Sequence, residues 1–178
     1  MVLPFRNQFH MFMRLPRLLS RLRLPPEHPD SIHPALLNSI YLAACSIGGG
    51  QMAEYESRFL AQTRTESERA LAFVDRLVHF MWASVILASY YIRRGRIVEA
   101  HNTISGTVSF AVAMGLHQTP ATHGSESIAL PPADEIETHD RVALWHALTQ
   151  LEASISMRTG LPTVTPKDVC LPIGHTAW

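Results

Sequence analysis

Residues 69–118 constrain the fold most, because they combine a long apolar stretch with a single glycine turn. Apolar side chains recur there at steps of three and four, the spacing that places them on one face of an α-helix. They are Leu71, Val74, Val78, Met81, Val85, Ala88 and Ile92. The turn sequence Arg93-Arg94-Gly95-Arg96 interrupts the pattern, and a second helical pattern continues to Leu116. The stretch therefore predicts two long helices joined by a tight turn.

The first of these helices is apolar on nearly every side between Phe80 and Tyr91, which is typical of a helix inside a bundle. The second helix carries small residues beside its apolar face, namely Ser105, Gly106, Ser109 and Ala113. Glycine costs about 1 kcal/mol of helix propensity, so we interpret Gly106 as a position where another backbone approaches closely. We expect Gly115 to end this helix as its C-cap.

Two helices are expected before this pair. Pro34 suits the first turn of a helix, and Gly48-Gly49-Gly50 is expected to end that helix. A shorter helix is predicted over residues 52–62. Thr65, followed three residues later by Glu68, has the pattern of a capping box, which predicts that the first long helix begins there.

The last predicted helix begins at Thr138, a candidate N-cap, and ends at Gly160. Its expected buried face consists of Val142, Trp145, Leu148, Leu151 and Ile155. The preceding residues 119–137 contain prolines, glycines, serines and threonines but few apolar residues. We interpret them as a mobile loop within the domain.

Residues 1–26 are expected to form short helical pieces, interrupted at Pro16, that pack on the bundle. Arginines occur there among Phe, Met and Leu before the first acid, Glu27, which superficially suits a mitochondrial presequence. Pro4 and Pro16 break the helix that a presequence needs, and serine is nearly absent. We therefore interpret this segment as part of the bundle, with its arginines turned toward solvent.

The composition of the 178 residues excludes several classes of protein. Hydrophobic residues make up 47% of the chain and charged residues 17%, which fits extensive buried surface. Fifteen basic residues balance fifteen acidic ones, whereas a module that grips a nucleic-acid backbone is usually basic. No stretch reaches the roughly 20 apolar residues that cross a membrane. We expect one all-α domain, a multi-helix bundle of antiparallel helical hairpins.

Sequence patterns for catalysis or metal binding are missing. No two of the ten histidines have the spacing of three or four that puts two ligands on one helix face. Cys45 and Cys170 alone cannot complete a four-ligand zinc site. There is no Gly-x-Ser-x-Gly elbow, and the triple glycine lacks the ending of a phosphate loop. We therefore expect no enzyme activity, and no cofactor or metal in this chain.

Two blocks of sequence resemble a known family. The first block is the apolar helix that ends in Gly95-Arg96, the following helix with Ala100 near its start, and then Gly115-Leu116-His117. The second block contains Glu137, Arg141, Trp145, Glu152, Ser156, Gly160, Pro162, Asp168, Leu171 and Pro172. In this order they resemble the fungal-specific transcription factor domain, the middle homology region of zinc-cluster regulators.

The resemblance extends from about Asn7 to Pro172 and also includes the His33-Pro34 helix start. The chain departs from the pattern where His146 replaces a second tryptophan and Leu161 replaces an arginine. The family pattern has aspartate where Glu152 stands. We interpret residues 33–172 as part of such a regulatory domain.

This resemblance implies a nuclear protein that acts in transcription regulation. DNA-binding and zinc would belong to a six-cysteine cluster in a segment that this chain does not contain. The implied partners are other transcription regulators, a second copy of the chain as a dimer, or a small-molecule effector. A membrane is not among them.

A small apolar effector is expected between the two central helices and the Trp145 helix, where small residues face bulky aromatics. The candidate ligand or partner residues are Trp82, Ser105, Ser109, Trp145 and Glu152. We expect Glu152 to form a structural salt bridge with Arg141 or Arg158. The alternative function is a tetratricopeptide-like scaffold for protein interaction, although no repeat of about 34 residues is visible.

Overall fold

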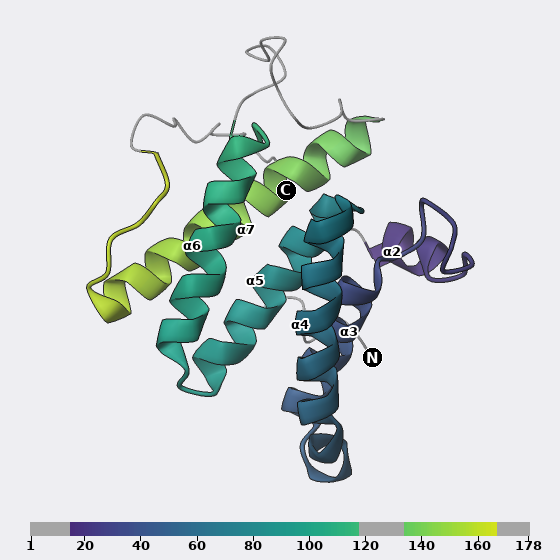
Figure 1. Ribbon diagram of the computed structural model, residues 1–178, viewed down its shortest axis with the longest axis horizontal. Coiled ribbons are helices and arrows are strands. Elements are labelled where there is room, and N and C mark those ends of the chain that lie inside the picture. The colour runs from purple at the N-terminus through teal and green to yellow at the C-terminus, as the bar shows by residue number, and fades with distance from the viewer. Residues whose placement is uncertain (1–14, 118–133, 167–178) are drawn as a thin grey trace.

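The computed structural model describes residues 15–117 and 134–166 of the chain. In these residues the regular structure is helical, without a strand, and it confirms the all-α class expected from the sequence. The elements are α2 (Leu15–Arg21), α3 (Pro34–Gly48), the 3-10 helix η1 (Gly50–Tyr55), α4 (Glu56–Phe73), α5 (Leu77–Arg93), α6 (Ile97–Ala113) and α7 (Glu135–Thr159) (Figure 1).

Helix α5 is the centre of the bundle. It packs against α3, α4, α6 and α7, and Figure 1 shows it between α4 and α6. Every residue from His79 to Tyr91 is buried, as the apolar sequence on all sides of this helix predicts. Four helices therefore share one core built around α5.

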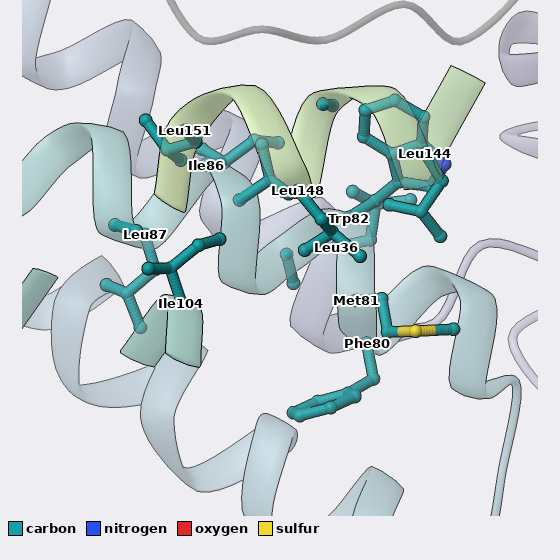
Figure 2. Close-up of a cluster of buried hydrophobic side chains, with 14 of the residues drawn as sticks. Leu36, Phe80, Met81, Trp82, Ile86, Leu87, Ile104, Leu144, Leu148 and Leu151 are labelled. Atoms are coloured by element: carbon teal, nitrogen blue, oxygen red, sulfur yellow. The ribbon is translucent and has the colours of Figure 1, made fainter. Parts of the chain in front are cut away.

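Helix α7 closes this core on the side of α6. Its buried residues include Trp145, Leu148, Leu151 and Ile155, each no more than 2% exposed, so most of the predicted face is confirmed. Figure 2 shows side chains from α3, α5, α6 and α7 gathered in one cluster, with Trp82 of α5 among them. At roughly 25 cal/mol per Å² of buried apolar surface, such large side chains dominate the stability of the fold.

The α5–α6 turn has the glycine that its geometry requires. Gly95 has a φ of 71°, in the left-handed region that a side chain disfavours. The Arg96 guanidinium lies over the ring of Tyr91, 4.7 Å from its centroid, and pairs with Glu99 at 2.7 Å. Gly115, with a φ of 74°, follows the end of α6 as predicted.

The first long helix is not continuous, contrary to the sequence prediction. α4 ends at Phe73, and Val74 and Arg76 adopt left-handed φ values of 55° and 43° before α5 begins at Leu77. The apolar stripe therefore does not pass through the bend as one buried face. Leu71, Phe73 and Val74 are instead exposed, at 42%, 75% and 68%.

Local contacts and a contact with the distant residue Ser31 hold this bend. The backbone N–H of Asp75 donates to the carbonyl of Ala70 at 2.9 Å, which closes the end of α4. The Arg76 guanidinium donates to the carbonyl and the hydroxyl of Ser31, at 3.2 and 2.6 Å. It also pairs with the Asp75 carboxylate at 2.8 Å. Together these contacts offset the cost of two left-handed residues, about 1–2 kcal/mol each.

The predicted capping box at Thr65 and Glu68 is wrong, because both residues lie inside α4. The separate helix expected over residues 52–62 is also wrong as a unit. Its first residues belong to the 3-10 helix η1, and the rest belong to α4. Helix α3 begins at Pro34 and ends at Gly48, as the sequence predicts.

The last helix begins earlier than Thr138. Asp134 is its N-cap, and the Asp134 carboxylate accepts a hydrogen bond from the backbone N–H of Glu137 at 2.6 Å. Residues 135–137 are therefore helical rather than part of the predicted loop, whose preceding residues 119–133 lie outside the described residues. Of the predicted N-terminal segment 1–26, residues 1–14 also lie outside them, while Leu18 of α2 is 2% exposed and part of the core.

Candidate functional site: a groove between α4, α5 and α6

A groove of about 410 Å³ lies where α4 and α6 flank α5. One wall is the face of α4 formed by Arg64, Ser67, Glu68 and Leu71. The floor is formed by Phe80, Ser84 and Leu87 of α5. The other wall is the face of α6 formed by Thr103, Gly106, Thr107 and Phe110. The volume is within the range of about 300–1,000 Å³ that is usual for small-molecule sites.

The two ends of the groove differ in chemistry. At the aromatic end, the rings of Phe80 and Phe110 meet edge to face with centroids 5.9 Å apart, and Leu71 belongs to the same end. At the opposite end, the chain order of the antiparallel helices places Arg64 and Thr103. The groove therefore runs from an apolar, aromatic end to a cationic end.

Arg64 is held at the cationic end by a tyrosine. Its Nε–H donates to the Tyr91 hydroxyl at 2.8 Å, and its guanidinium carbon is 5.5 Å from the centroid of the Tyr91 ring. The neighbouring Arg96 is already neutralised by Glu99. Among the described residues, no carboxylate lies within ion-pair distance of Arg64, although the positive charge of Arg64 helps to lower the pKa of Glu99. The terminal amino groups of Arg64 are therefore available to an anionic group.

Glu68 is the acidic residue of the same wall. It lies one helical turn after Arg64, is exposed, and has no ion-pair partner within residues 15–117 and 134–166. An arginine that precedes a glutamate by four residues has the less favourable orientation for a helical ion pair. The wall therefore presents one cation and one anion that form no ion pair with each other.

Hydroxyl groups line the middle of the groove. Ser84 donates to the carbonyl of Phe80 at 3.1 Å, and Thr107 donates to that of Thr103 at 2.7 Å. Their hydrogens are satisfied by the helix, so their oxygens present lone pairs as acceptors. Ser67 adds a buried hydroxyl for which the described residues supply no partner.

Gly106 faces open space, which corrects the sequence interpretation. A side chain at this position would meet no atom within 4 Å, so close approach of another backbone is not the reason for the glycine. Because Gly106 has no side chain, it leaves space on the α6 wall of the groove. A larger residue at this position would project into the groove without displacing the core.

We expect Gly106→Ala to raise the free energy of unfolding by about 1 kcal/mol, because the helix loses its glycine and nothing obstructs the new methyl group. Urea unfolding monitored by circular dichroism measures the change. Gly95→Ala is the matched control and should destabilise the protein, since Gly95 has a φ of 71°. Destabilisation by Gly106→Ala would contradict the open position of residue 106.

The five residues predicted as a site from sequence do not line this groove. Trp82 and Trp145 are 0% and 1% exposed, and both indole N–H groups are buried without a hydrogen-bond partner in the described chain. Ser105 is partly buried on α6, and Ser109 is exposed and donates to the carbonyl of Ser105 at 3.0 Å. Glu152 lies at 0% exposure on α7, so the structure does not bring the five together at one surface.

Glu152 forms hydrogen bonds with the segment that follows α7, whereas a salt bridge is expected from the sequence. Its carboxylate accepts hydrogen bonds from the backbone N–H groups of Val164 and Thr165, at 2.8 and 3.2 Å. It also accepts from the Thr165 hydroxyl. Arg141, one of the two expected partners, pairs with Glu137 at 2.8 Å.

We expect Glu152→Ala to lower the free energy of unfolding by about 2 kcal/mol, because three donors lose a charged acceptor. Thermal unfolding measures the loss. Glu152→Gln keeps one acceptor oxygen and should lose less. Equal stability of Glu152→Ala and the wild type would contradict the fastening role.

A second polar cluster joins α3 to α5 at their N-terminal ends, and the sequence analysis missed it. The Nδ1 of His79 accepts from the backbone N–H of His33 at 3.3 Å, and Arg21 Nη1 lies 3.3 Å from its Nε2. His33 is the N-cap of α3 and accepts from the backbone N–H of Ala35 at 3.1 Å. Burial, together with Arg21 and Arg76, lowers the pKa of His79 from 6.5 to about 3.

This cluster caps α3 and connects it to α5 by hydrogen bonds. Within the described ranges, no group of three His, Cys, Asp or Glu side chains is placed to hold a metal ion. Cys45, a free cysteine buried in α3, has a pKa raised by its burial.

The residues described here also include no helix with the length and apolarity needed to span a membrane. The groove remains the best candidate for ligand binding.

Fold and site together define the class: an all-α, multi-helix protein with an open groove between three of its helices. Comparison with known protein families, with characterised proteins and with solved structures found no match to this chain.

Proposed function

We propose that this chain is a regulatory domain of the kind found in fungal zinc-cluster transcription factors, and that it acts in the nucleus without catalysing a reaction. The observation that carries the effector-sensing role is the groove, which combines an aromatic end, a cationic end and a lining that includes hydroxyl groups. Binding of an effector there would touch α4, α5 and α6 at once.

The contacts between the two blocks of family-like sequence support this proposal. The ring of His117, from the first block, lies 6.0 Å from that of Trp145, from the second. Gly95 and Gly115 have positive φ values, which accounts for glycine at both positions. Glu152 fastens the segment after Gly160. The residues of the resemblance thus have structural roles that a related chain would also need.

The bend between α4 and α5 is the place where a bound effector would change the angle between helices. Val74 and Arg76 hold left-handed backbone conformations there, and α4 leads directly into the bend from the groove wall. A ligand that contacts both α4 and the α5–α6 hairpin favours one angle between them, which shifts the population of conformers. Partner regulators, or a second copy of the chain, would bind one of these conformers more tightly than the other.

A transcription assay tests the proposal. The chain is fused to a DNA-binding module of known target, and a reporter gene is placed behind that target. We expect the fusion to change reporter output relative to the module alone. Gly106→Trp, which fills the groove, should alter that output, whereas Gly106→Ala should not. Identical output from the fusion and the module alone would contradict the regulatory role.

A helical-hairpin scaffold for protein interaction is the second candidate. The succession of two hairpins, α3–α4 and α5–α6, favours it, as do the exposed side chains of Phe73 and Val74. This function would depend on the bend rather than the groove. It predicts that Phe73→Ser abolishes the reporter effect and that Gly106→Trp leaves it unchanged.

A further inference from the structure

We propose that the groove selects a zwitterionic ligand of the α-amino-acid type that carries an aromatic side chain. This inference rests on the proposed effector role and deepens it by naming the class of ligand. It follows from the two charged side chains of the α4 wall that have no ion-pair partner among the described residues, and from their position relative to the aromatic end.

The first step is the arrangement of charge. Arg64 and Glu68 are one turn apart, so their Cβ atoms are about 5–6 Å from each other. Both side chains line the groove, and neither has an ion-pair partner among the residues that the structure describes. An α-amino acid carries its carboxylate and its ammonium on one carbon, so a single small molecule can satisfy both side chains.

The second step is the direction of binding. The Nε–H of Arg64 is taken by Tyr91, which leaves its two terminal amino groups to donate to a carboxylate. Glu68 then accepts from the ammonium group, one turn nearer to the aromatic end. Leu71 follows at the next turn, with Phe80 and Phe110 beside it. The side chain of the ligand therefore extends along the groove toward these apolar residues.

The third step excludes ligands with one charge. A carboxylate with an apolar tail would bind Arg64 but would also lie beside the like-charged Glu68. An amine with the same tail would bind Glu68 but would face Arg64. The other charged pair at this end is Arg96 with Glu99, whose pKa is lowered mainly by its hydrogen bond from Arg96 and to a lesser extent by the charge of Arg64. The zwitterion alone gains from both side chains.

Three ligands of matched shape test the inference: L-phenylalanine, 3-phenylpropionate, which lacks the ammonium, and 2-phenylethylamine, which lacks the carboxylate. Calorimetric titration of the whole chain measures their affinities. We expect L-phenylalanine to bind about tenfold more tightly than either analogue. Arg64→Gln should bring L-phenylalanine and 2-phenylethylamine to equal affinity. Glu68→Gln should do the same for L-phenylalanine and 3-phenylpropionate.

The chain offers matched controls for both variants. Arg69 and Glu66 lie on the same helix and pair with each other at 3.1 Å, away from the groove lining. Arg69→Gln and Glu66→Gln should leave all three affinities unchanged, and circular dichroism checks that each variant is folded. Gly106→Trp should abolish binding of all three ligands.

Two results would overturn the inference. One is equal or tighter binding of 3-phenylpropionate or 2-phenylethylamine by the wild type, and the other is the absence of binding by L-phenylalanine. Neither result decides the reporter experiment, in which Gly106→Trp reports on the groove whatever its ligand. The ligand class and the regulatory role therefore fail separately.

Discussion

Replacing Trp145 with alanine will lower the free energy of unfolding by about 3–5 kcal/mol. Trp145 is 1% exposed, lies in the shared core, and contacts His117 of the segment after α6 through their rings. Alanine leaves a cavity where α7 meets the α5–α6 hairpin, and the surrounding helices cannot close it fully. Urea unfolding followed by circular dichroism measures the loss.

The same helix supplies the control for this experiment. Met157 is 82% exposed, so Met157→Ala should change stability by less than about 0.5 kcal/mol. Trp145→Phe keeps an aromatic ring at the position and should lose less than Trp145→Ala, which keeps the experiment informative if the alanine variant unfolds. Similar stabilities for Trp145→Ala and Met157→Ala would show that α7 does not close the core.

Acidification below pH 6.5 will destabilise the protein through His79. Its pKa falls from 6.5 in the unfolded chain to about 3 in the folded one, so the unfolded state binds the extra proton between these values. The stability that His79 supplies is therefore complete above pH 6.5 and declines as the pH falls toward 3. The slope from this group approaches about 1.4 kcal/mol per pH unit.

Comparing the pH dependence of stability in the wild type and in His79→Gln isolates the contribution of His79. Asp75 and Asp134 have lowered pKa values from their arginine and backbone partners, so acid also removes the stability that these groups supply. We expect His79→Gln to show a shallower loss of stability than the wild type between pH 6.5 and pH 4. Parallel pH profiles of the two proteins, measured by urea unfolding, would contradict the assignment.

The sequence predicts those parts of the fold whose physical cause is local. The apolar residues around α5 allow only a buried helix, and the chain buries all of them from His79 to Tyr91. Gly95 marks the α5–α6 turn and Gly115 the end of α6, because a positive φ favours glycine. The period of α7 likewise identifies Trp145 as buried.

The bend at Val74–Arg76 is not predicted, because no glycine or proline marks it. It depends on Arg76 reaching Ser31, a residue far away in the chain. The apolar period continues through the bend in the sequence, so it predicts Leu71 and Val74 on a buried stripe although the structure exposes them. A tertiary contact here overrides the local pattern.

The groove is not predicted for a different reason. Its walls are helix faces of mixed character, and Arg64, Glu68 and Thr103 have the spacing and polarity of a solvated surface. These residues form a groove only because the fold places α4 and α6 on either side of α5. The five residues predicted from the sequence lie elsewhere: Trp82, Trp145 and Glu152 are at most 1% exposed, and Ser105 and Ser109 lie outside the groove lining.

A methyl-labelled NMR titration with L-phenylalanine tests the central claim, that the effector binds in the groove and not under Trp145. The leucine methyl groups report on both places. We predict shifts for Leu71 and Leu87, which line the groove, and none for Leu144 and Leu148, which α7 contributes to the core. Shifts confined to Leu144 and Leu148, or the absence of any shift at saturating ligand, would contradict the account.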